Sequence, residues 1–429
     1  MRNETRADID GTRLDPHRDW ESKSPVPNAF LPATAMVLLK QHAGRPARCV
    51  VGRGDTIREG MVLGVPDGEG SAFVHSPIPG TVRSISTIRL PGGAECEAVE
   101  ILLRGGFDRL GKRPERYVWK GMRKFDILQA LKSKGVVETG GRGMPLDSLL
   151  ESSARRREIL IYAIDTEPYL RTEAAVFASR AEDTIEAARI VASVIDASGI
   201  RVLVGHGFEA SESDRESSSR QKDTDGLPVE FVHTDGARPA ATRGKAAGRE
   251  GMKNGNQLRL TPSSLVAVYD AVVEAKAFVE RYLTVAGGAI RHPSVLKARI
   301  GTPIGDLVEE CGGFLESPER LVLGGPLTGL PARDLDMPVT KTMGAVLALT
   351  PPETRRGKVR PCIRCGRCRE ICPVGIDPET IFRSLSGGRL AEARVEGLGS
   401  CISCGLCSYI CPSRIELSQS FAAQFGAAR

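Results

Sequence analysis

Eight of the eleven cysteines form two copies of one pattern near the C-terminus. The copies are Cys362-x-x-Cys365-x-x-Cys368-x-x-x-Cys372-Pro373 and Cys401-x-x-Cys404-x-x-Cys407-x-x-x-Cys411-Pro412. A cubane iron-sulfur cluster needs four converging thiolates. A CxxCxxC loop supplies three of them, with its backbone amides turned towards the cluster, and the fourth comes from elsewhere. The repeated pattern therefore predicts two 4Fe-4S clusters.

The last cysteine of each copy determines how the ligands are shared. In two-cluster ferredoxins it ligates the other cluster. We therefore assign Cys362, Cys365, Cys368 and Cys411 to the first cluster, and Cys372, Cys401, Cys404 and Cys407 to the second. Structural zinc is the alternative, but zinc sites usually use paired CxxC hooks or mixed Cys/His ligands. The other three cysteines, Cys49, Cys96 and Cys311, are scattered, which favours small buried residues over a disulfide framework.

Basic residues surround the first cysteine copy. Cations there would offset the negative cluster and attract an acidic redox partner, whereas the alternative is an ordinary solvated face. The residues are Arg355, Arg356, Lys358, Arg360, Arg364, Arg367 and Arg369.

The remaining composition limits the function classes. The chain has 429 residues, too many for one compact core, and its formal charge of +6 is spread thinly, so nucleic acid is not indicated. No apolar run reaches the roughly 20 residues that cross a bilayer, and the N-terminus lacks the apolar core of a secretory signal. We expect a cytoplasmic chain without a transmembrane segment of its own, recruited to a membrane only by partners.

The elements that must position the cysteines fall into distinct segments. Residues 1–31 are polar and predict a flexible or docking arm. Short β-type runs separated by glycine turns over 32–110 resemble a biotinyl or lipoyl barrel-sandwich domain, but its hairpin Ser76-Pro77-Ile78-Pro79-Gly80 has no lysine to modify. The runs EILIYAI and RVLVG, with a helical pattern between Glu182 and Ala197 stopped by Gly199, predict a βαβ unit in an α/β domain over 120–279. Two polar insertions, 210–226 and 236–257, interrupt it.

Together these parts resemble the C subunit (RnfC) family of the Rnf ion-translocating electron transport complexes. The stretches that carry the resemblance are LLKQHAGRPA at 38–47, PIPGTV, AVVEAKAFVERYLTVAG at 271–287, IGTPIGDLVEECGG at 300–313, GGPLTG, MPVTKTMGAVLAL and both cysteine copies. The resemblance implies a multidomain α/β plus β protein. Its parts would be a barrel-sandwich domain, an α/β domain like the flavin subunit of complex I, a β-grasp-like SLBB segment over 280–335 and a dicluster ferredoxin domain over 350–420.

The resemblance also implies a flavin that is reduced by a nicotinamide cofactor and passes single electrons through the clusters to membrane partners. The matching glycine loop here is Gly140-Gly141-Arg142-Gly143-Met144-Pro145, followed by Asp147, with Leu149 where the family has a lysine. A flavin phosphate needs amide donors and usually a cation. We therefore expect FMN to bind weakly or not at all, with Arg142 as the one possible compensation.

Three functions remain open at this point. The first is a peripheral subunit on the inner face of the cell membrane that relays electrons within an Rnf-like complex. The second is an FMN-dependent NADH dehydrogenase or a flavoprotein similar to cobalamin reductases, and the third is a scaffold with structural clusters. The sequence does not name the electron donor, the acceptor, the direction of flow, the translocated ion or the oligomeric state.

Overall fold

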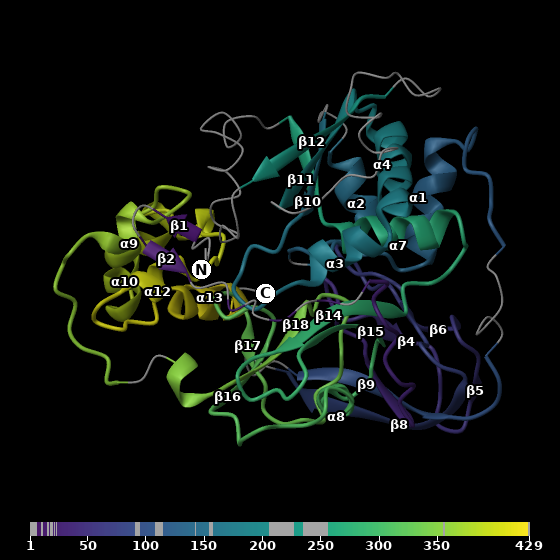
Figure 1. Ribbon diagram of the computed structural model, residues 1–429, viewed down its shortest axis with the longest axis horizontal. Helices are drawn as coiled ribbons and strands as arrows, with labels where there is room; N and C mark the ends of the chain where they lie inside the picture. The colour runs from purple at the N-terminus through teal and green to yellow at the C-terminus, as the bar shows by residue number, and fades with distance from the viewer. Residues whose placement is uncertain are drawn as a thin grey trace.

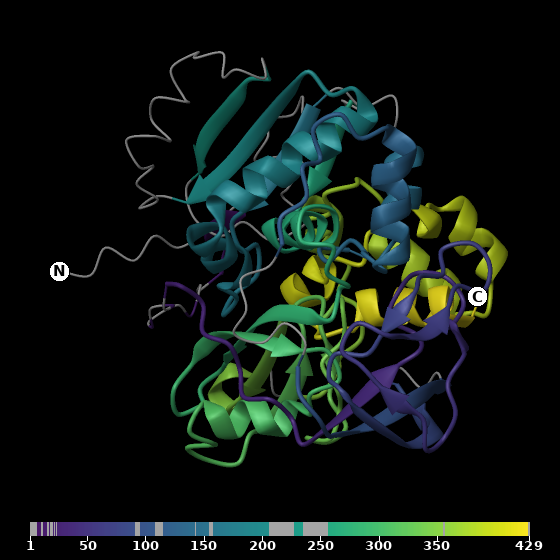
Figure 2. The ribbon, with the colours of Figure 1, turned by 90° about the vertical axis from the view of Figure 1, so that its right-hand side faces the viewer.

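The computed structural model describes residues 7–9, 12–14, 17, 20, 22, 24–90, 95–107, 115–141, 143–153, 158–205, 227–234, 256–354 and 357–427. Four units lie side by side (Figure 1). They are a barrel-sandwich unit, an α/β unit, a mixed-sheet unit and a C-terminal cysteine unit. Turning the molecule shows the barrel-sandwich and mixed-sheet units together below the α/β unit (Figure 2). Both polar insertions lie outside the described residues, apart from Asn256 and Gln257.

The barrel-sandwich unit consists of two antiparallel sheets with strand orders β3-β9-β8-β5 and β4-β6-β7. Apolar residues that alternate along the strands, such as Val37, Val82 and Ile101, form the core between them. The tip of the 76–80 hairpin is buried: Ile78 is inaccessible, and the Ser76 hydroxyl donates to its carbonyl at 2.6 Å. This hairpin presents nothing to solvent. The strands are β3 Thr34–Leu38, β4 Arg48–Cys49, β5 Thr56–Ile57, β6 Val62–Val65, β7 Val74–His75, β8 Gly80–Arg89 and β9 Glu95–Leu103.

The α/β unit contains a parallel sheet in the order β12-β11-β10-β13, covered by helices. The expected βαβ unit is present as β10, α4 and β11, but α4 ends before Gly199. Asp196 adopts a left-handed conformation (φ 54°) and stops the helix, as Asp tolerates better than most residues. The elements are α1 Lys124–Ser133, α2 Leu146–Glu151, β10 Glu158–Ala163, α3 Thr172–Ser179, α4 Ala181–Ile195, β11 Gly199–Gly205, β12 Val229–Thr234, β13 Gln257–Leu260 and α7 Pro262–Val272.

The mixed-sheet unit has the strand order β15-β14-β18-β16-β17. Its central strand β18 pairs in parallel with β14 and antiparallel with β16. The sheet therefore includes a strand, β18, that lies beyond the segment 280–335 expected from the sequence. This short apolar strand is separated from β17 by a long connection. The elements are β14 Glu280–Ala286, β15 Ser294–Arg299, α8 Ile304–Glu310, β16 Arg320–Leu323, β17 Leu330–Pro331 and β18 Ala345–Leu349.

The cysteine unit is built of short helices around the two cysteine loops. Its small core contains Ile381, Leu398 and Phe421 together with Cys401, Cys407 and Cys411. The thiols thus form part of the packing. The helices are α9 Arg367–Glu370, α10 Pro378–Ser386, α11 Leu390–Val395, α12 Leu406–Ile410 and α13 Leu417–Ala427.

The N-terminal arm was expected to be a flexible or docking segment over 1–31. Its described part includes a hairpin of β1 Ala7–Ile9 and β2 Thr12–Leu14. Further along, the backbone N–H of Val26 donates to Ser179 Oγ at 3.2 Å, that of Ala29 to the Lys297 carbonyl at 2.9 Å, and that of Phe30 to Glu310 Oε2 at 2.9 Å. This end of the arm is bound to the α/β and mixed-sheet units.

Lys341 joins three of the units. Its buried ammonium donates to the Phe73 carbonyl at 2.8 Å and to the Gly135 carbonyl at 2.7 Å, while its backbone N–H donates to Gln41 Oε1 at 3.0 Å. The barrel-sandwich, α/β and mixed-sheet units are therefore held in a fixed relation at this point. Across the described ranges, none of the helices has both the length and the apolar character needed to span a bilayer.

Candidate metal centre

The eight cysteines separate into two groups of four. Cys362, Cys365, Cys368 and Cys411 line one cavity, and Cys372, Cys401, Cys404 and Cys407 line another. The first cavity has a volume of about 240 Å³ and the second about 20 Å³, so the second set of thiols is more closely packed. Within the part of the chain that the structure describes, no three His, Cys, Asp or Glu side chains are arranged to hold a single metal ion. Each group has the four soft thiol donors that a cubane takes at its corners.

Burial sets the protonation of these thiols. It raises the pKa of Cys368 and Cys404 to about 11, and that of Cys407 to about 12, with neighbouring cysteines adding to the effect. These three thiols are therefore neutral at physiological pH before metal binds. Since thiolates are the ligands of iron, cluster insertion must release these protons.

The two cysteine loops, called here hook one (362–368) and hook two (401–407), have the same backbone geometry. Arg364 and Ser403 occupy equivalent positions and have φ values of 52° and 54°, and Gly366 and Gly405 have φ values of 76° and 75°. In each hook the backbone N–H two residues after the first cysteine approaches its Sγ at 3.4 Å. These amides point at sulfur, and hydrogen bonds to cluster sulfurs are one of the means by which a protein tunes the reduction potential.

A turn of the mixed-sheet unit covers hook two. Gly405 lies directly under the Leu327 carbonyl, so a Cβ at this position would overlap the carbonyl oxygen. The carboxylate of Glu167 in the α/β unit holds the turn, accepting from the backbone N–H of Leu327 at 2.8 Å and of Thr328 at 3.2 Å and from the Thr328 hydroxyl. Three units therefore meet at the second cysteine group.

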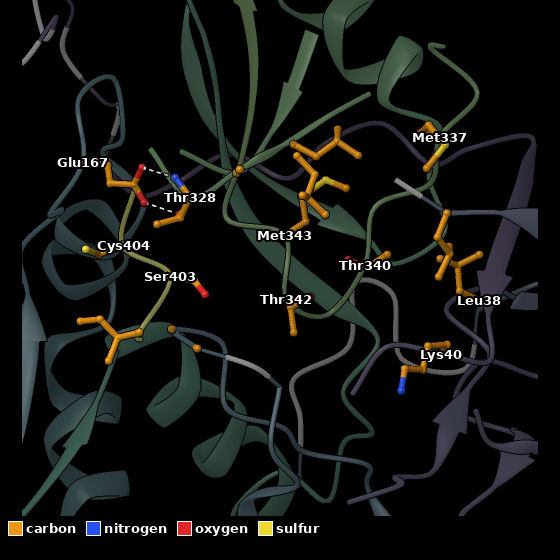
Figure 3. Close-up of a pocket in the computed structure, with 18 of the residues that line it drawn as sticks. Leu38, Lys40, Glu167, Thr328, Met337, Thr340, Thr342, Met343, Ser403 and Cys404 are labelled. Atoms are coloured by element: carbon orange, nitrogen blue, oxygen red, sulfur yellow. Dashed lines mark hydrogen bonds between the residues drawn. The ribbon is translucent and has the colours of Figure 1, made fainter. Parts of the chain in front are cut away.

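A cavity with a volume of about 750 Å³ lies beside this turn. Figure 3 shows Ser403 and Cys404 on one side of it, and Leu38 and Lys40 of the barrel-sandwich unit on the other, with Met343 between them. Gly140 and Gly141 of the glycine loop also line it. A cysteine of hook two thus borders a largely apolar internal cavity.

The glycine loop differs from a phosphate cradle in its charge. The Glu138 carboxylate lies against both cavity-lining glycines, at 3.1 Å from a Cβ built on Gly140 and 2.5 Å from one built on Gly141. Gly143 (φ 74°) is packed against Thr342, and Arg142 lies outside the described residues. An acidic side chain this close to the turn disfavours a bound phosphate, although the Arg281 guanidinium offsets part of its charge.

The two substitutions noted in the sequence are not at the cavity. Leu149 packs against the α/β core, and Asp147 is half-buried near Lys132, where burial raises its pKa. Neither residue lines the cavity, whose cations are Lys40 and Arg259. Glu138 and Glu167 were not identified from the sequence. The contacts of both carboxylates depend on how segments far apart in the chain fold, so the sequence carries no local signal for them.

The basic residues expected around hook one are on the surface where they are described. Lys358, Arg360, Arg364, Arg367 and Arg369 are all exposed, and so are Cys362 and Cys365. Arg355 and Arg356 lie outside the described residues. Cys96 and Cys311 are buried and Cys49 is partly buried in the barrel-sandwich core, as expected for small apolar residues.

Three known domain families match the chain. They are the RnfC barrel sandwich hybrid domain over residues 9–104, the SLBB domain over 282–331 and the 4Fe-4S dicluster domain over 358–415. The chain is therefore a multidomain protein of mixed α/β content with barrel-sandwich, SLBB and 4Fe-4S dicluster domains. The predicted iron-sulfur clusters are confirmed by the last of these matches.

Among known proteins, one similar chain is the C subunit of the ion-translocating oxidoreductase complex of Rhodobacter capsulatus, which is 31% identical over 427 residues, covering 96% of this chain and 81% of that one. The C subunit of the proton-translocating ferredoxin:NAD(+) oxidoreductase complex of Clostridium ljungdahlii is 27% identical, covering 86% of this chain and 82% of that one. The C subunit of the ion-translocating oxidoreductase complex of Pseudomonas aeruginosa is 28% identical over 86% of this chain, which spans only 49% of it.

Among solved structures, a chain of an NAD+-reducing [NiFe]-hydrogenase superposes with a TM-score of 0.48 and 18% identity. The superposition covers 71% of this chain and 62% of that one. The domain matches and the identity shared with the Rhodobacter capsulatus protein along nearly the whole chain lead to one conclusion: this chain belongs to the RnfC family, the C subunits of ion-translocating oxidoreductase complexes.

Proposed function

We propose that this chain is a peripheral electron-transfer subunit of an Rnf-type ion-translocating oxidoreductase complex, placed on the cytoplasmic face of the membrane by its partner subunits. The observation that carries the proposal is the division of eight cysteines into two four-cysteine cavities, in a chain of the RnfC family. A 4Fe-4S cluster exchanges one electron at a time. The residues of the chain hold two such centres next to each other, limit water at the inner one and direct backbone amides at their sulfurs.

The ligand assignment is part of this proposal. Hook one with Cys411 would hold the first cluster, and hook two with Cys372 the second. The grouping of the cysteines around the two cavities supports this crossed arrangement. Because each cluster takes one ligand from the other repeat, the two centres lie close together, and the unit serves as a path for electrons rather than as a scaffold.

Metal analysis tests the number and the kind of the clusters. The chain, reconstituted without oxygen, should contain about eight iron and eight acid-labile sulfide per molecule. Dithionite reduction should produce electron paramagnetic resonance signals from two interacting clusters. Zinc in place of iron, or half this iron content, would contradict the proposal. Clusters that resist reduction at accessible potentials would leave only the scaffold function.

The alternative is a flavoprotein that oxidises NADH. We infer that the middle domain resembles the flavin subunit of complex I in fold, and that it has lost the flavin. The Glu138 carboxylate beside Gly140 and Gly141 supports this inference, because it adds negative charge to the loop that corresponds to the phosphate-binding turn.

A flavin titration separates the two functions. We expect FMN to bind weakly or not at all, and NADH to leave the clusters oxidised. A Glu138→Gln variant removes the charge while keeping the side-chain size, and is the matched test of the electrostatic argument. Tight stoichiometric FMN binding by the unmodified chain, with rapid reduction of the clusters by NADH, would establish the flavoprotein function instead.

A further inference from the structure

The two hooks share their backbone geometry, so the differences between them do not come from cluster ligation. Position 364 corresponds to 403 and position 366 to 405, and the N–H to Sγ distances are equal. Any requirement set by the cluster acts on both copies alike. Side chains that differ between matched positions therefore reflect the surroundings of each hook.

The surroundings of the two hooks differ. In hook two, Cys401 is 9% exposed, Leu406 is 1% exposed and Gly405 lies under the Leu327 carbonyl, and only Ile402 is exposed, at 50%. In hook one every residue from 357 to 367 is exposed, and a Cβ on Gly366 would meet nothing within 4 Å. Hook two is therefore largely covered by the neighbouring units, whereas hook one is exposed to solvent.

The matched side chains differ in charge in the same way. Ser403, Leu406 and Ser408 of the covered hook correspond to Arg364, Arg367 and Arg369 of the exposed one. Lys358 and Arg360 add further cations, and the Arg414 guanidinium packs against Gly357. For these cations, the structure records one ion pair among the described residues, between Arg369 and Asp377 at 3.9 Å. Glu370 and Glu379 are the nearby acids in sequence.

This surface also exposes apolar side chains. Val359, between Lys358 and Arg360 in the sequence, is 63% exposed. Ile363, between Cys362 and Arg364, is 67% exposed, and its counterpart Ile402 in hook two is 50% exposed. An exposed cation far from any partner contributes little to stability. A basic surface with an apolar centre at the edge of a redox site has the composition of a transient protein interface, in which charge steers the partner and the apolar centre makes the contact.

We propose that this surface, residues 357–367 with Arg369 and Arg414, is the docking face for an acidic electron-transfer protein or subunit. The partner's redox centre would lie against the edge of the first cluster at Cys362 and Cys365, and one electron would pass between the two centres. The proposal rests on the proposed function, since it needs the first cluster. An anionic membrane surface is the competing occupant, but it has no redox centre to bring to the exposed thiolates.

The test uses the cluster-loaded chain and a small acidic ferredoxin as the probe. The test variant carries Lys358→Glu, Arg360→Glu and Arg367→Glu. The matched control carries Arg53→Glu, Arg58→Glu and Arg89→Glu, which are three exposed cations of the barrel-sandwich unit. Both variants change the net charge equally. Affinity is measured by calorimetry, and electron transfer by stopped-flow absorbance.

We expect the test variant to lower the association rate by about tenfold or more, and the control by less than about twofold. Raising the salt concentration from about 20 mM to about 300 mM should lower the association rate of the unmodified chain to a similar degree. A Lys358→Arg, Arg360→Lys, Arg367→Lys variant should keep the unmodified rate. Equal losses in both triple variants, or rates independent of salt, would overturn the proposal.

Two further measurements keep the outcomes separate. Iron content must be unchanged in the test variant, and calorimetric affinity is compared beside the electron-transfer rate, because reversing cations next to the first cluster also shifts its reduction potential. A failure of iron binding or of dithionite reduction in the unmodified chain contradicts the proposed function rather than the docking face. Vesicles containing phosphatidylglycerol test the competing occupant. If the test variant loses vesicle binding but keeps the ferredoxin rate, the surface binds lipid and the docking proposal is wrong.

Discussion

At the scale of single residues, the eight cysteines differ mainly in what surrounds them. Cys362 and Cys365 face solvent, while Cys401, Cys407 and Cys411 are part of a hydrophobic core. A low-dielectric surrounding and hydrogen bonds to sulfur both act on the reduction potential of a cluster. The two centres of this chain are therefore not equivalent, although their loops have the same conformation.

The crossed ligation predicts how cysteine substitutions combine. Cys372→Ser should remove the second cluster and leave about four iron per chain, because the first keeps all its thiolates. Adding Cys401→Ser should cost no further iron, since both residues serve one cluster. Adding Cys362→Ser instead should remove the remaining iron. Iron content and paramagnetic resonance of the single and double variants give the answer, and the reverse pattern would exchange the partners of Cys372.

At the scale of elements, the cover on hook two is a turn that belongs to another unit. The turn between β16 and β17 reaches Gly405 only because Glu167 accepts hydrogen bonds from its backbone. Leu327 packs with Ile371 and Leu406 in a small cluster of its own. Positioning of the second centre thus depends on the α/β and mixed-sheet units as well as on the cysteine unit.

Gly405 and Gly366 have the same backbone conformation, so alanine substitutions at the two positions isolate the effect of the turn that covers Gly405. Gly405→Ala and Gly366→Ala both place a Cβ at positive φ, which costs about 1–2 kcal/mol. Only the Cβ of Gly405→Ala would also overlap the Leu327 carbonyl oxygen. We expect Gly405→Ala to lower the thermal midpoint more and to make the second cluster accessible to iron chelators. Calorimetry and chelation kinetics measure this, and equal effects of the two substitutions would show that the turn does not seal the hook.

The sequence carries a local signal for the cysteine spacing and for the alternation of strands and helices, because both depend on residues close together in the chain. Cys362 to Cys411 and the run from Glu158 to Gly205 carry their own periodicity. The cover of Gly405 by Leu327 and the position of Glu138 beneath the glycines depend on contacts between segments far apart in the chain. Such packing leaves no periodic signal. Leu149 was selected by its alignment with a lysine, yet its side chain packs in the core.

At the scale of the whole molecule, buried basic groups lie where the units join. Burial and the nearby Lys341 cation lower the pKa of both His42 and His75 to about 3. Burial also lowers the pKa of Lys341 itself to about 7. The histidines are therefore neutral in the folded chain throughout the physiological range, and they pack as polar but uncharged residues between the barrel-sandwich and α/β units.

The lowered pKa values of His42 and His75 predict that the stability of the fold depends on pH. Unfolding lets each one bind a proton below its ordinary pKa of about 6.5, while the folded chain excludes that proton until about pH 3. The contribution of these two histidines is thus complete well above pH 6.5 and is lost on acidification, with a slope that approaches about 1.4 kcal/mol per pH unit for each histidine below their ordinary pKa. Urea midpoints between about pH 5 and 6.5, followed by circular dichroism, should show this slope.

His75→Gln should reduce the slope by about one proton. His292→Gln is the matched control, because His292 is exposed, and should leave the slope unchanged. A slope that is the same in the unmodified chain and in His75→Gln would mean that another group takes up the proton.

The division of the cysteines between two cavities also constrains how the protein is made. Residue 411 emerges from the ribosome after every other ligand, yet it lines the cavity of hook one, the first hook to be synthesised. Hook one thus cannot complete its set of four thiols from its own repeat, and hook two needs Cys372 from the earlier one. Because Cys411 lies only four positions after Cys407, both sets become complete at nearly the same point of synthesis, and neither repeat can mature as an independent unit.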